Sequence, residues 1–208
     1  MKIISTMVRD IPYWAIKEAS RDKKLNSMLS SGDKIPVTLS NKENIVFTVG
    51  RDSHNTYLIA ESCIITPMLM CENAKTMHSW READLREWLN EVFFNLLPTD
   101  VQDIIKTTVI QQEFRGMSSQ SRDKIFIPSL KQIYGDGIWG DIDVDNEQID
   151  IFKNPQNRVK FLNDRIEWWW SRTPHNASVG EARFGICSDV PISDVATNRH
   201  GTVPMFRI

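Results

Sequence analysis

The sequence predicts an α+β fold in which one long helix lies across a small antiparallel sheet. Residues 85–96 carry apolar side chains at helical spacing, and strand-like segments stand on either side of them. The last third of the chain consists of short strand-like runs separated by polar loops. We therefore expect one long amphipathic helix, several short helices and a long, loop-rich C-terminal half.

The long helix is expected over residues 79–97. Ser79 and Glu82 have the spacing of a capping box, in which each side chain binds a free backbone N–H, and Pro98 ends the segment. Six apolar side chains fall on one stripe of this helix: Leu85, Trp88, Leu89, Val92, Phe93 and Leu96. Burying them would contribute roughly 10 kcal/mol before entropy is subtracted. Such a helix must pack against a sheet.

The strands of this sheet are expected mainly before the helix. Residues 37–39 and 45–49 have the alternation and β-branching of a hairpin, and residues 57–65 are apolar on both faces, as in a central strand. A short helix over residues 13–19 precedes them. We expect residues 1–31 to be a helical attachment segment and residues 32–208 to form a single globular domain.

The elements after the long helix are expected to be short. They are a helix beginning at Thr99, a polar loop over 111–121, a strand over 124–127, one or two helical turns over 129–134, a Gly- and Asp-rich loop over 135–150, and a helix over 156–163. From Trp168 to Ile208 we expect short strands between long polar loops.

Composition and charge disfavour nucleic-acid binding and a membrane-spanning chain. The net charge is −2 without a block of like charge, so the strong phosphate-driven attraction of a nucleic-acid binder is not predicted. No apolar run approaches the roughly 18 residues that cross a membrane, and the first residues meet a charge too early for a signal peptide. A soluble chain made in a cytoplasm is expected. Cys63, Cys71 and Cys187 are expected to be free, buried thiols.

Two segments carry a family resemblance. Residues 85–90 read Leu-Arg-Glu-Trp-Leu-Asn, and residues 169–174 read Trp-Trp-Ser-Arg-Thr-Pro. Less distinctive matches follow the same order along the chain, at residues 32–34, 38–41, 80, 95–98, 123–129, 158–162 and 201–208. Together they make the chain similar to a family of phage and Firmicutes prophage proteins known as domain of unknown function 6273.

The resemblance implies a C-type-lectin-like fold, with a small twisted antiparallel sheet and a C-terminal half that displays loops. It implies a scaffold for recognition, because related folds form receptor-binding tips of phage tails and targets of diversity-generating retroelements. Residues 174–208 lack the dense Asn, Tyr and Ser positions that adenine mutagenesis leaves behind. A copy that is currently diversifying is therefore not expected.

The best candidate ligand contacts lie around three consecutive tryptophans, residues 168–170. On a strand they must alternate between faces, so at least one indole points away from the core that the others fill. An exposed indole can stack on a sugar or anchor a protein; the alternative is that loops cover it. Asp189 and Asp194 are among the polar residues nearby. The candidate ligand-binding residues are Trp169, Trp170, Arg172, His175, Arg183, Asn198, Arg199 and His200.

No metal or cofactor is expected. Residues 141–147 resemble the first half of a calcium loop, but an EF-hand counted from Asp141 needs Gly at position 146 and Glu at position 152, where this chain has Asn146 and Phe152. A solvated acidic loop is favoured instead. The calcium motifs of lectins, Glu-Pro-Asn and Trp-Asn-Asp, are missing from the sequence. The four histidines are scattered without metal-ligand spacing.

An enzyme is not expected either. The sequence has no Gly-x-Ser-x-Gly and no phosphate-cradling Gly-rich loop. Formylglycine-generating enzymes share a related fold, but they need two reactive cysteines late in the chain, where only Cys187 stands. A cleft that joins Cys187 to His175 or His200 would revive this possibility.

Two non-enzymatic functions remain open. The first is a phage or prophage structural or adhesion protein of the virion, on the tail or surface, whose C-terminal loops recognise a bacterial surface glycan or protein. Homo-oligomers and contacts with other virion proteins would accompany it. Burial of both Trp169 and Trp170, with the C-terminal loops packed on the same chain, would contradict it. The alternative is an intracellular phage protein that binds and inhibits a host factor.

Overall fold

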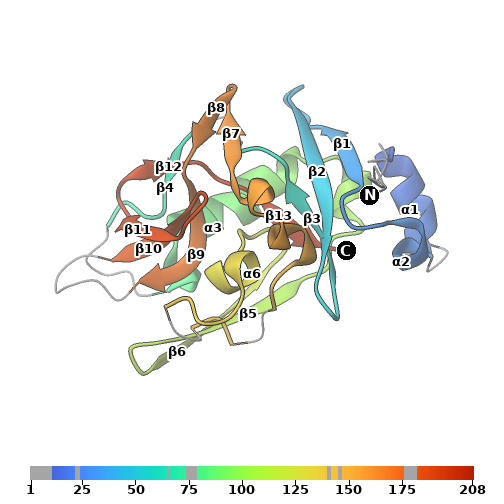
Figure 1. Ribbon diagram of the computed structural model, residues 1–208. Helices are drawn as coiled ribbons and strands as arrows, with labels where there is room; N and C mark the ends of the chain where they lie inside the picture. Colours follow the sequence, from blue (N-terminus) through green and yellow to red (C-terminus); the bar gives the residue numbers. More distant parts are fainter. Residues whose placement is uncertain are drawn as a thin grey trace, which may run out of the picture.

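A computed structural model describes residues 11–21, 24–64, 66–73, 79–139, 142–144, 147–175 and 182–208 (Figure 1). Within these ranges, the strands form one four-stranded sheet, one three-stranded sheet and three two-stranded ribbons, and all paired strands run antiparallel. Helices are short. No helix among the described residues is long and apolar enough to cross a membrane. A mixed fold of helices and small antiparallel sheets, as expected, is confirmed.

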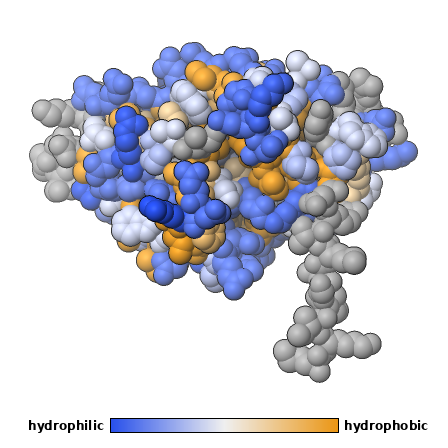
Figure 2. Space-filling model, turned by 90° about the horizontal axis from the view of Figure 1, so that it is seen from above, coloured by the Kyte–Doolittle hydropathy of each residue, from blue (hydrophilic) through white to orange (hydrophobic). Residues whose placement is uncertain are grey.

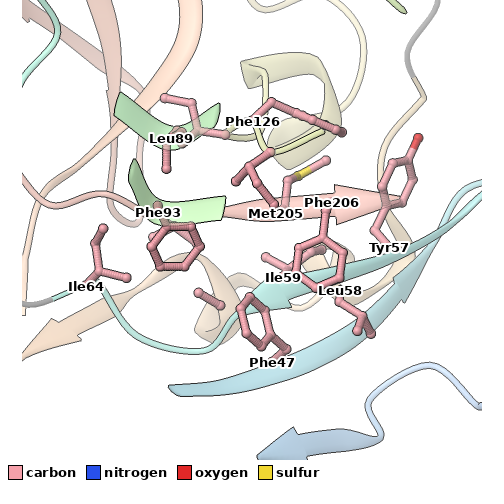
Figure 3. Packing of buried hydrophobic residues seen from close by; sticks show 14 of the residues in the cluster. Phe47, Tyr57, Leu58, Ile59, Ile64, Leu89, Phe93, Phe126, Met205 and Phe206 are labelled. Carbon is pink, nitrogen blue, oxygen red and sulfur yellow. The ribbon is translucent and has the colours of Figure 1, made fainter. Parts of the chain in front are cut away.

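The four-stranded sheet joins the two ends of the chain. Its order is β1 (Lys34–Thr38), β2 (Asn44–Arg51), β3 (Thr56–Ala60) and β13 (Met205–Arg207). The predicted hairpin is β1 and β2. The central strand predicted over residues 57–65 corresponds to β3, which is buried along its whole length but ends at Ala60. Phe47 and Phe206 meet edge to face with ring centroids 5.1 Å apart, and Figure 3 shows them in the core between the sheet and the helical segment.

Two short helices precede the sheet: α1 (Tyr13–Arg21), where a helix was predicted, and α2 (Leu25–Met28). Ile16 of α1 and Leu29 after α2 belong to the same core cluster as the sheet, so both helical segments pack on the domain. The role of residues 1–31 as an attachment segment stays a prediction, and residues 1–10 lie outside the described ranges.

The prediction of one long α-helix over residues 79–97 is wrong. The segment is divided into η1 (Trp80–Glu82), α3 (Asp84–Trp88), the π-helical turn η2 (Leu89–Phe93) and α4 (Phe94–Leu96). Ser79 forms no side-chain cap, and Ala83 is extended, with ψ 129°, so η1 cannot continue into α3. The sequence matched the capping-box pattern, but the backbone does not form it.

The π-helical turn also changes which side chains face the core. A π turn closes i→i+5 hydrogen bonds, so it holds more residues than an α turn. Buried side chains accordingly recur every four residues, at Leu85, Leu89, Phe93 and Leu97. Val92, which the regular helical period places inward, is 47% exposed.

The predicted polar loop over residues 111–121 is also wrong, because this segment forms a hairpin of β5 (Thr108–Phe114) and β6 (Met117–Asp123). Arg115 and Gly116 form its turn with φ values of 52° and 75°, as a two-residue hairpin turn requires. The inward face of the hairpin carries polar residues, of which Gln112, Ser121 and Asp123 are buried. A buried polar face conceals the alternation by which a strand is recognised.

The remaining elements are short. They are β4 (Met68–Leu69), α5 (Thr99–Gln102), α6 (Leu130–Tyr134), η3 (Asp150–Lys153), η4 (Pro155–Arg158), β7 (Lys160–Leu162), β8 (Arg165–Glu167), β9 (Trp169–His175), β10 (Arg183–Cys187), β11 (Ile192–Val195) and β12 (Arg199–His200). The helical turns predicted over 129–134 are α6, and the short strands predicted after Trp168 are present. The helix predicted over 156–163 is instead the 3₁₀ turn η4 followed by β7, and residues 124–127 form an isolated bridge rather than a strand.

A buried carboxylate fixes the helical segment to the hairpin. Asp123, whose side chain has no exposed surface, accepts hydrogen bonds from Trp80 Nε1 at 2.9 Å, Arg86 Nε at 2.6 Å and Ser121 Oγ at 2.7 Å. Asn90 binds the next residues, donating to Ile125 O and accepting from Lys124 N and Ile125 N. The Leu-Arg-Glu-Trp-Leu-Asn motif therefore has a structural role, because its Arg and Asn hold residues 123–125 against α3 and η2.

We expect Asp123→Ala to lower the free energy of unfolding by about 3–5 kcal/mol, because it leaves the partly buried Arg86 guanidinium and the Trp80 indole N–H without their acceptor. Urea unfolding measures this change. The matched control is Glu113→Ala on the same hairpin, an exposed side chain whose removal should change stability by less than about 0.5 kcal/mol. Equal, small effects of both substitutions would contradict the role of Asp123.

Lys160 is buried beneath β3, where its Nζ donates to Ala60 O at 3.1 Å. Burial lowers the pKa of Lys160 to about 8, against an ordinary value of 10.5, although Cys63 and Glu61 oppose the shift. Between these values the unfolded chain binds more protons than the folded one, so the contribution of Lys160 to stability rises with pH.

The difference in unfolding free energy between the wild type and Lys160→Met should therefore rise by about 1 kcal/mol from about pH 7 to about pH 9. Comparing the two proteins cancels the titration of the buried cysteines and tyrosines, which they share. Parallel stability curves over this range would show that Lys160 titrates normally.

Candidate functional site

The three consecutive tryptophans divide between surface and core. Trp168, before β9, is 49% exposed, whereas Trp169 and Trp170 are fully buried. Trp169 Nε1 donates to Arg158 O at 2.9 Å, and Trp170 Nε1 donates to Met68 O at 2.7 Å. Both indoles thus have their polar atom satisfied inside the protein, so the expectation that Trp169 and Trp170 form a ligand surface is not met.

Both faces of β9 are covered, which explains why successive tryptophans can be buried. The ring of Phe152 stacks on Trp169 with centroids 6.2 Å apart, and His200 meets Trp170 edge to face at 4.6 Å. The strand runs between β10 and residues of the C-terminal segment, since Trp170 N also donates to Gly201 O. Of the three tryptophans, only Trp168, which precedes the strand, reaches solvent.

Arg172 is likewise an interior residue and not a surface contact. Its guanidinium donates to Ile127 O and Gln132 Oε1, both at 2.7 Å, and lies beside Asp143, with Nε 3.5 Å from Oδ1. Burial lowers the pKa of Arg172, and the Asp143 carboxylate opposes that effect. Thr173 Oγ1 donates to Asp143 Oδ2 at 2.6 Å.

The predicted acidic loop over residues 141–147 is therefore not wholly solvated, because Asp143 is buried as the counterion of Arg172. Glu147 accepts a hydrogen bond from Ser53 Oγ at 2.8 Å. Residues 141, 145 and 146 lie outside the described ranges. Among the described residues, no group of three or more His, Cys, Asp or Glu side chains could hold a metal ion.

His175 and Arg183 face each other at the ends of β9 and β10. The His175 ring packs on Trp139 with centroids 4.1 Å apart, and its Nδ1 is buried without a hydrogen-bond partner among the described residues. Burial and the charge of Arg183 lower the pKa of His175. Asn176, next along the chain, lies outside the described ranges.

Asp194 gathers three of the predicted residues. Its carboxylate lies 2.8 Å from His200 Nε2, accepts from Asn198 Nδ2 at 2.9 Å and stands 4.0 Å from Arg183 Nη2. Burial raises the pKa of Asp194, but the hydrogen bonds from Asn198, His200 and the backbone of Val195 outweigh it, so the pKa is lowered. The sequence placed Asp194 among nearby polar residues without identifying it as their centre.

Trp168 stands beside this cluster. Its ring lies 6.4 Å from that of His200, and its carbonyl accepts from Gly201 N at 2.7 Å. Ile166 is two residues earlier on an extended segment, which places it on the same side as Trp168, and Phe161 is its cross-strand partner. Both Ile166 and Phe161 are exposed.

We call these exposed residues, together with the two exposed polar residues that precede His200, the Trp168 surface: Phe161, Ile166, Trp168, Asn198 and Arg199. Arg199 Nη1 donates to Pro67 O at 3.1 Å, which orients its guanidinium. Figure 2 shows the face to which β7 and β8 point, where hydrophobic patches interrupt a mostly hydrophilic surface. An aromatic ring, aliphatic neighbours and oriented polar groups are suited to binding rather than to bond making.

The cysteines are not exposed nucleophiles. Cys63, Cys71 and Cys187 are free and buried, as predicted. Burial raises the pKa of Cys63 to about 12 and that of Cys187 well above its ordinary value, so both are neutral thiols at physiological pH. Cys187 is thus poorly placed to act with His175 or His200.

The Asp194 cluster predicts a specific pH dependence. A carboxyl whose folded pKa is lowered contributes stability above its unfolded pKa, and that contribution is lost as pH falls through the folded pKa. The stability advantage of the wild type over Asp194→Asn should therefore shrink between about pH 5 and about pH 2.5. Denaturant unfolding at both pH values measures it, and an advantage that does not change with acid would contradict the arrangement.

Comparison with known proteins identifies the family to which this chain belongs. No curated protein and no solved structure matches the chain. The family model described as Domain of unknown function (DUF6273) matches residues 54–205, which include the hairpin β5–β6, the tandem tryptophans and the Asp194 cluster. Because the match covers more than half of the sequence, the chain belongs to the DUF6273 family.

Proposed function

We propose that this chain is a non-enzymatic recognition module, a phage or prophage structural or adhesion protein that binds a bacterial surface glycan or protein through the Trp168 surface. The observation that carries the proposal is Trp168 itself, an indole left 49% exposed beside an ordered polar cluster. Its position differs from the one expected from sequence, because Trp169 and Trp170 are buried. Their burial removes the contact surface on which the adhesion hypothesis first rested.

An exposed indole is a natural anchor for a ligand. A tryptophan supplies a large, rigid, flat area that stacks on a sugar ring or fills a pocket of a partner protein. Trp168 follows directly on the β7–β8 ribbon and precedes the buried strand β9, so its backbone is fixed on both sides. Little conformational entropy is lost when such a side chain binds.

The Asp194 cluster adds polar groups in fixed positions. Asn198 and His200 are held by the same carboxylate, and Arg199 between them donates to a backbone carbonyl. Oriented amide and guanidinium groups beside an aromatic ring can bind sugar hydroxyls or the polar edge of a protein interface. Phe161 and Ile166 extend the apolar part of the contact.

A C-type-lectin-like fold, a phage origin and a place in the virion belong to this proposal. The small antiparallel sheets and the loops between the C-terminal strands support such a fold. Homo-oligomerisation, contact with other virion proteins and the intracellular inhibitor remain outcomes for experiment.

The test is binding of the labelled protein to intact Firmicutes cells and to glycans extracted from their walls. Trp168→Ala should weaken binding by roughly tenfold or more while leaving stability nearly unchanged, since the removed side chain is a half-exposed anchor. Trp14→Ala is the matched control, because Trp14 on α1 is also an exposed tryptophan, with 57% of its surface accessible against 49% for Trp168.

Binding to extracted glycan identifies a sugar ligand, and binding to protease-sensitive sites on cells identifies a protein ligand. If Trp168→Ala binds as tightly as the wild type, the Trp168 surface is not the contact. If the folded wild-type protein binds neither cells nor glycans, adhesion is contradicted, and capture of a host protein from lysate would then test the intracellular alternative.

A further inference from the structure

A second, chemically different site lies between the helical segment and the β5–β6 hairpin. It is an open cleft of about 590 Å³ lined by Arg81 of η1, Arg86 of α3 and three consecutive residues of β6, which are Gln120, Ser121 and Arg122. Three separate elements thus each contribute one arginine, and the lining includes no carboxylate.

The cleft carries uncompensated positive charge. Arg86 is paired with Asp123, which lies behind it and is fully buried. Within the described part of the chain, neither Arg81 nor Arg122 has a carboxylate within 4.0 Å, and both side chains are exposed. Three guanidinium groups against one paired carboxylate leave two positive charges at the cleft.

One of the three arginines is held in place before any ligand arrives. Arg86 Nε donates to Asp123 at 2.6 Å, and Arg86 Nη1 lies 3.4 Å from the backbone oxygen of Arg81. The ion pair with Asp123 engages the Nε side of the Arg86 guanidinium and fixes the plane of that group. β6 pairs with β5 in a two-stranded ribbon, and it also contacts η1. The walls of the cleft are therefore ordered elements of the core scaffold.

We propose that this cleft binds the phosphate group of a small phosphorylated ligand. A guanidinium presents paired N–H donors that match the oxygens of a phosphate, and several such forks around one group favour a dianion. Gln120 adds an amide on the same strand as Arg122. The site is independent of the Trp168 surface, and neither composition nor the family match points to it.

A compact anion fits the charge distribution better than a nucleic acid. A nucleic-acid binder presents a basic stripe that follows many phosphates, whereas this chain has a net charge of −2 and the cleft has two uncompensated charges. The site is suited to one phosphate and the small group attached to it.

The experiment is calorimetric titration of the full chain with inorganic phosphate and with glycerol phosphate at low ionic strength. We expect saturable one-site binding that weakens as salt is added. Arg122→Gln and Arg81→Gln should each weaken it by roughly tenfold, the effect of losing one charged hydrogen-bond pair. Arg122→Lys keeps the positive charge but loses the paired N–H donors of the guanidinium. Its affinity for phosphate should lie between those of the wild type and Arg122→Gln.

Arg165→Gln is the matched control, since Arg165 is an exposed arginine on β8, outside the cleft. Thermal unfolding of each variant confirms that it is folded; Arg86 is left unchanged because Asp123 depends on it. Tighter binding of glycerol phosphate than of phosphate supports a phosphorylated organic ligand, and equal binding supports free phosphate in the same site.

Three results would overturn the proposal. One is the lack of saturable binding by either anion to the folded wild type. The second is a loss of affinity in Arg165→Gln as large as that in the cleft variants, which would mean that the anion is attracted by the overall charge and not bound by the cleft. The third is a clear preference for a single-stranded oligonucleotide that depends on Arg81 and Arg122, which would make the cleft part of a nucleic-acid interface.

Discussion

The buried carboxylate of Asp123 is the interaction on which the rest of the structure depends. An ionised carboxylate without water is very costly unless donors surround it, and here the donors come from β6, η1 and α3. Gln112 extends the same network: it accepts from Trp80 N and donates to Asp143 Oδ1 and Arg172 O. Hairpin, helical segment and β9 are thereby held in one arrangement.

This network explains why the family motifs are found in the interior. The Arg of Leu-Arg-Glu-Trp-Leu-Asn binds Asp123, and the Arg of Trp-Trp-Ser-Arg-Thr-Pro binds Gln132 and lies beside Asp143. Residues that look like ligand contacts because they are aromatic or charged are used to build the scaffold. The groups on which the two proposals rest lie where this scaffold stops, at Trp168 before β9 and on the exposed face of β6.

Much of the fold could be predicted from apolar patterns. The hairpin β1–β2, the central strand β3 and the short C-terminal strands follow from alternation and β-branching, which report burial directly. The hairpin β5–β6 could not be predicted this way, since its buried face mixes Ile110 and Phe114 with the polar residues Gln112, Ser121 and Asp123. Gln112 and Asp123 both bind Trp80, which is distant in the sequence.

The candidate site was predicted only in part. Arg183, Asn198 and His200 do come together around Asp194, which in the sequence is only one of many acidic residues, whereas Arg199 binds Pro67 O instead. The alternation of side chains along a strand predicted that at least one of the three indoles points away from the core. It could not identify Trp168 as the exposed one, because β9 is covered on both faces. The π-helical turn also could not be predicted, because no sequence pattern marks it. Val92 was therefore placed on the buried face by the ordinary α-helical period, although it is exposed.

The most direct measurement is hydrogen exchange of the tryptophan indole N–H groups, followed by NMR with and without a bound ligand. Trp80, Trp169 and Trp170, whose indole N–H groups are bonded inside the protein, should exchange slowly, and Trp168 should exchange fast and be the one whose signal moves on binding. Rapid exchange at Trp169 and Trp170, or a ligand that shifts their signals and not that of Trp168, would contradict this account.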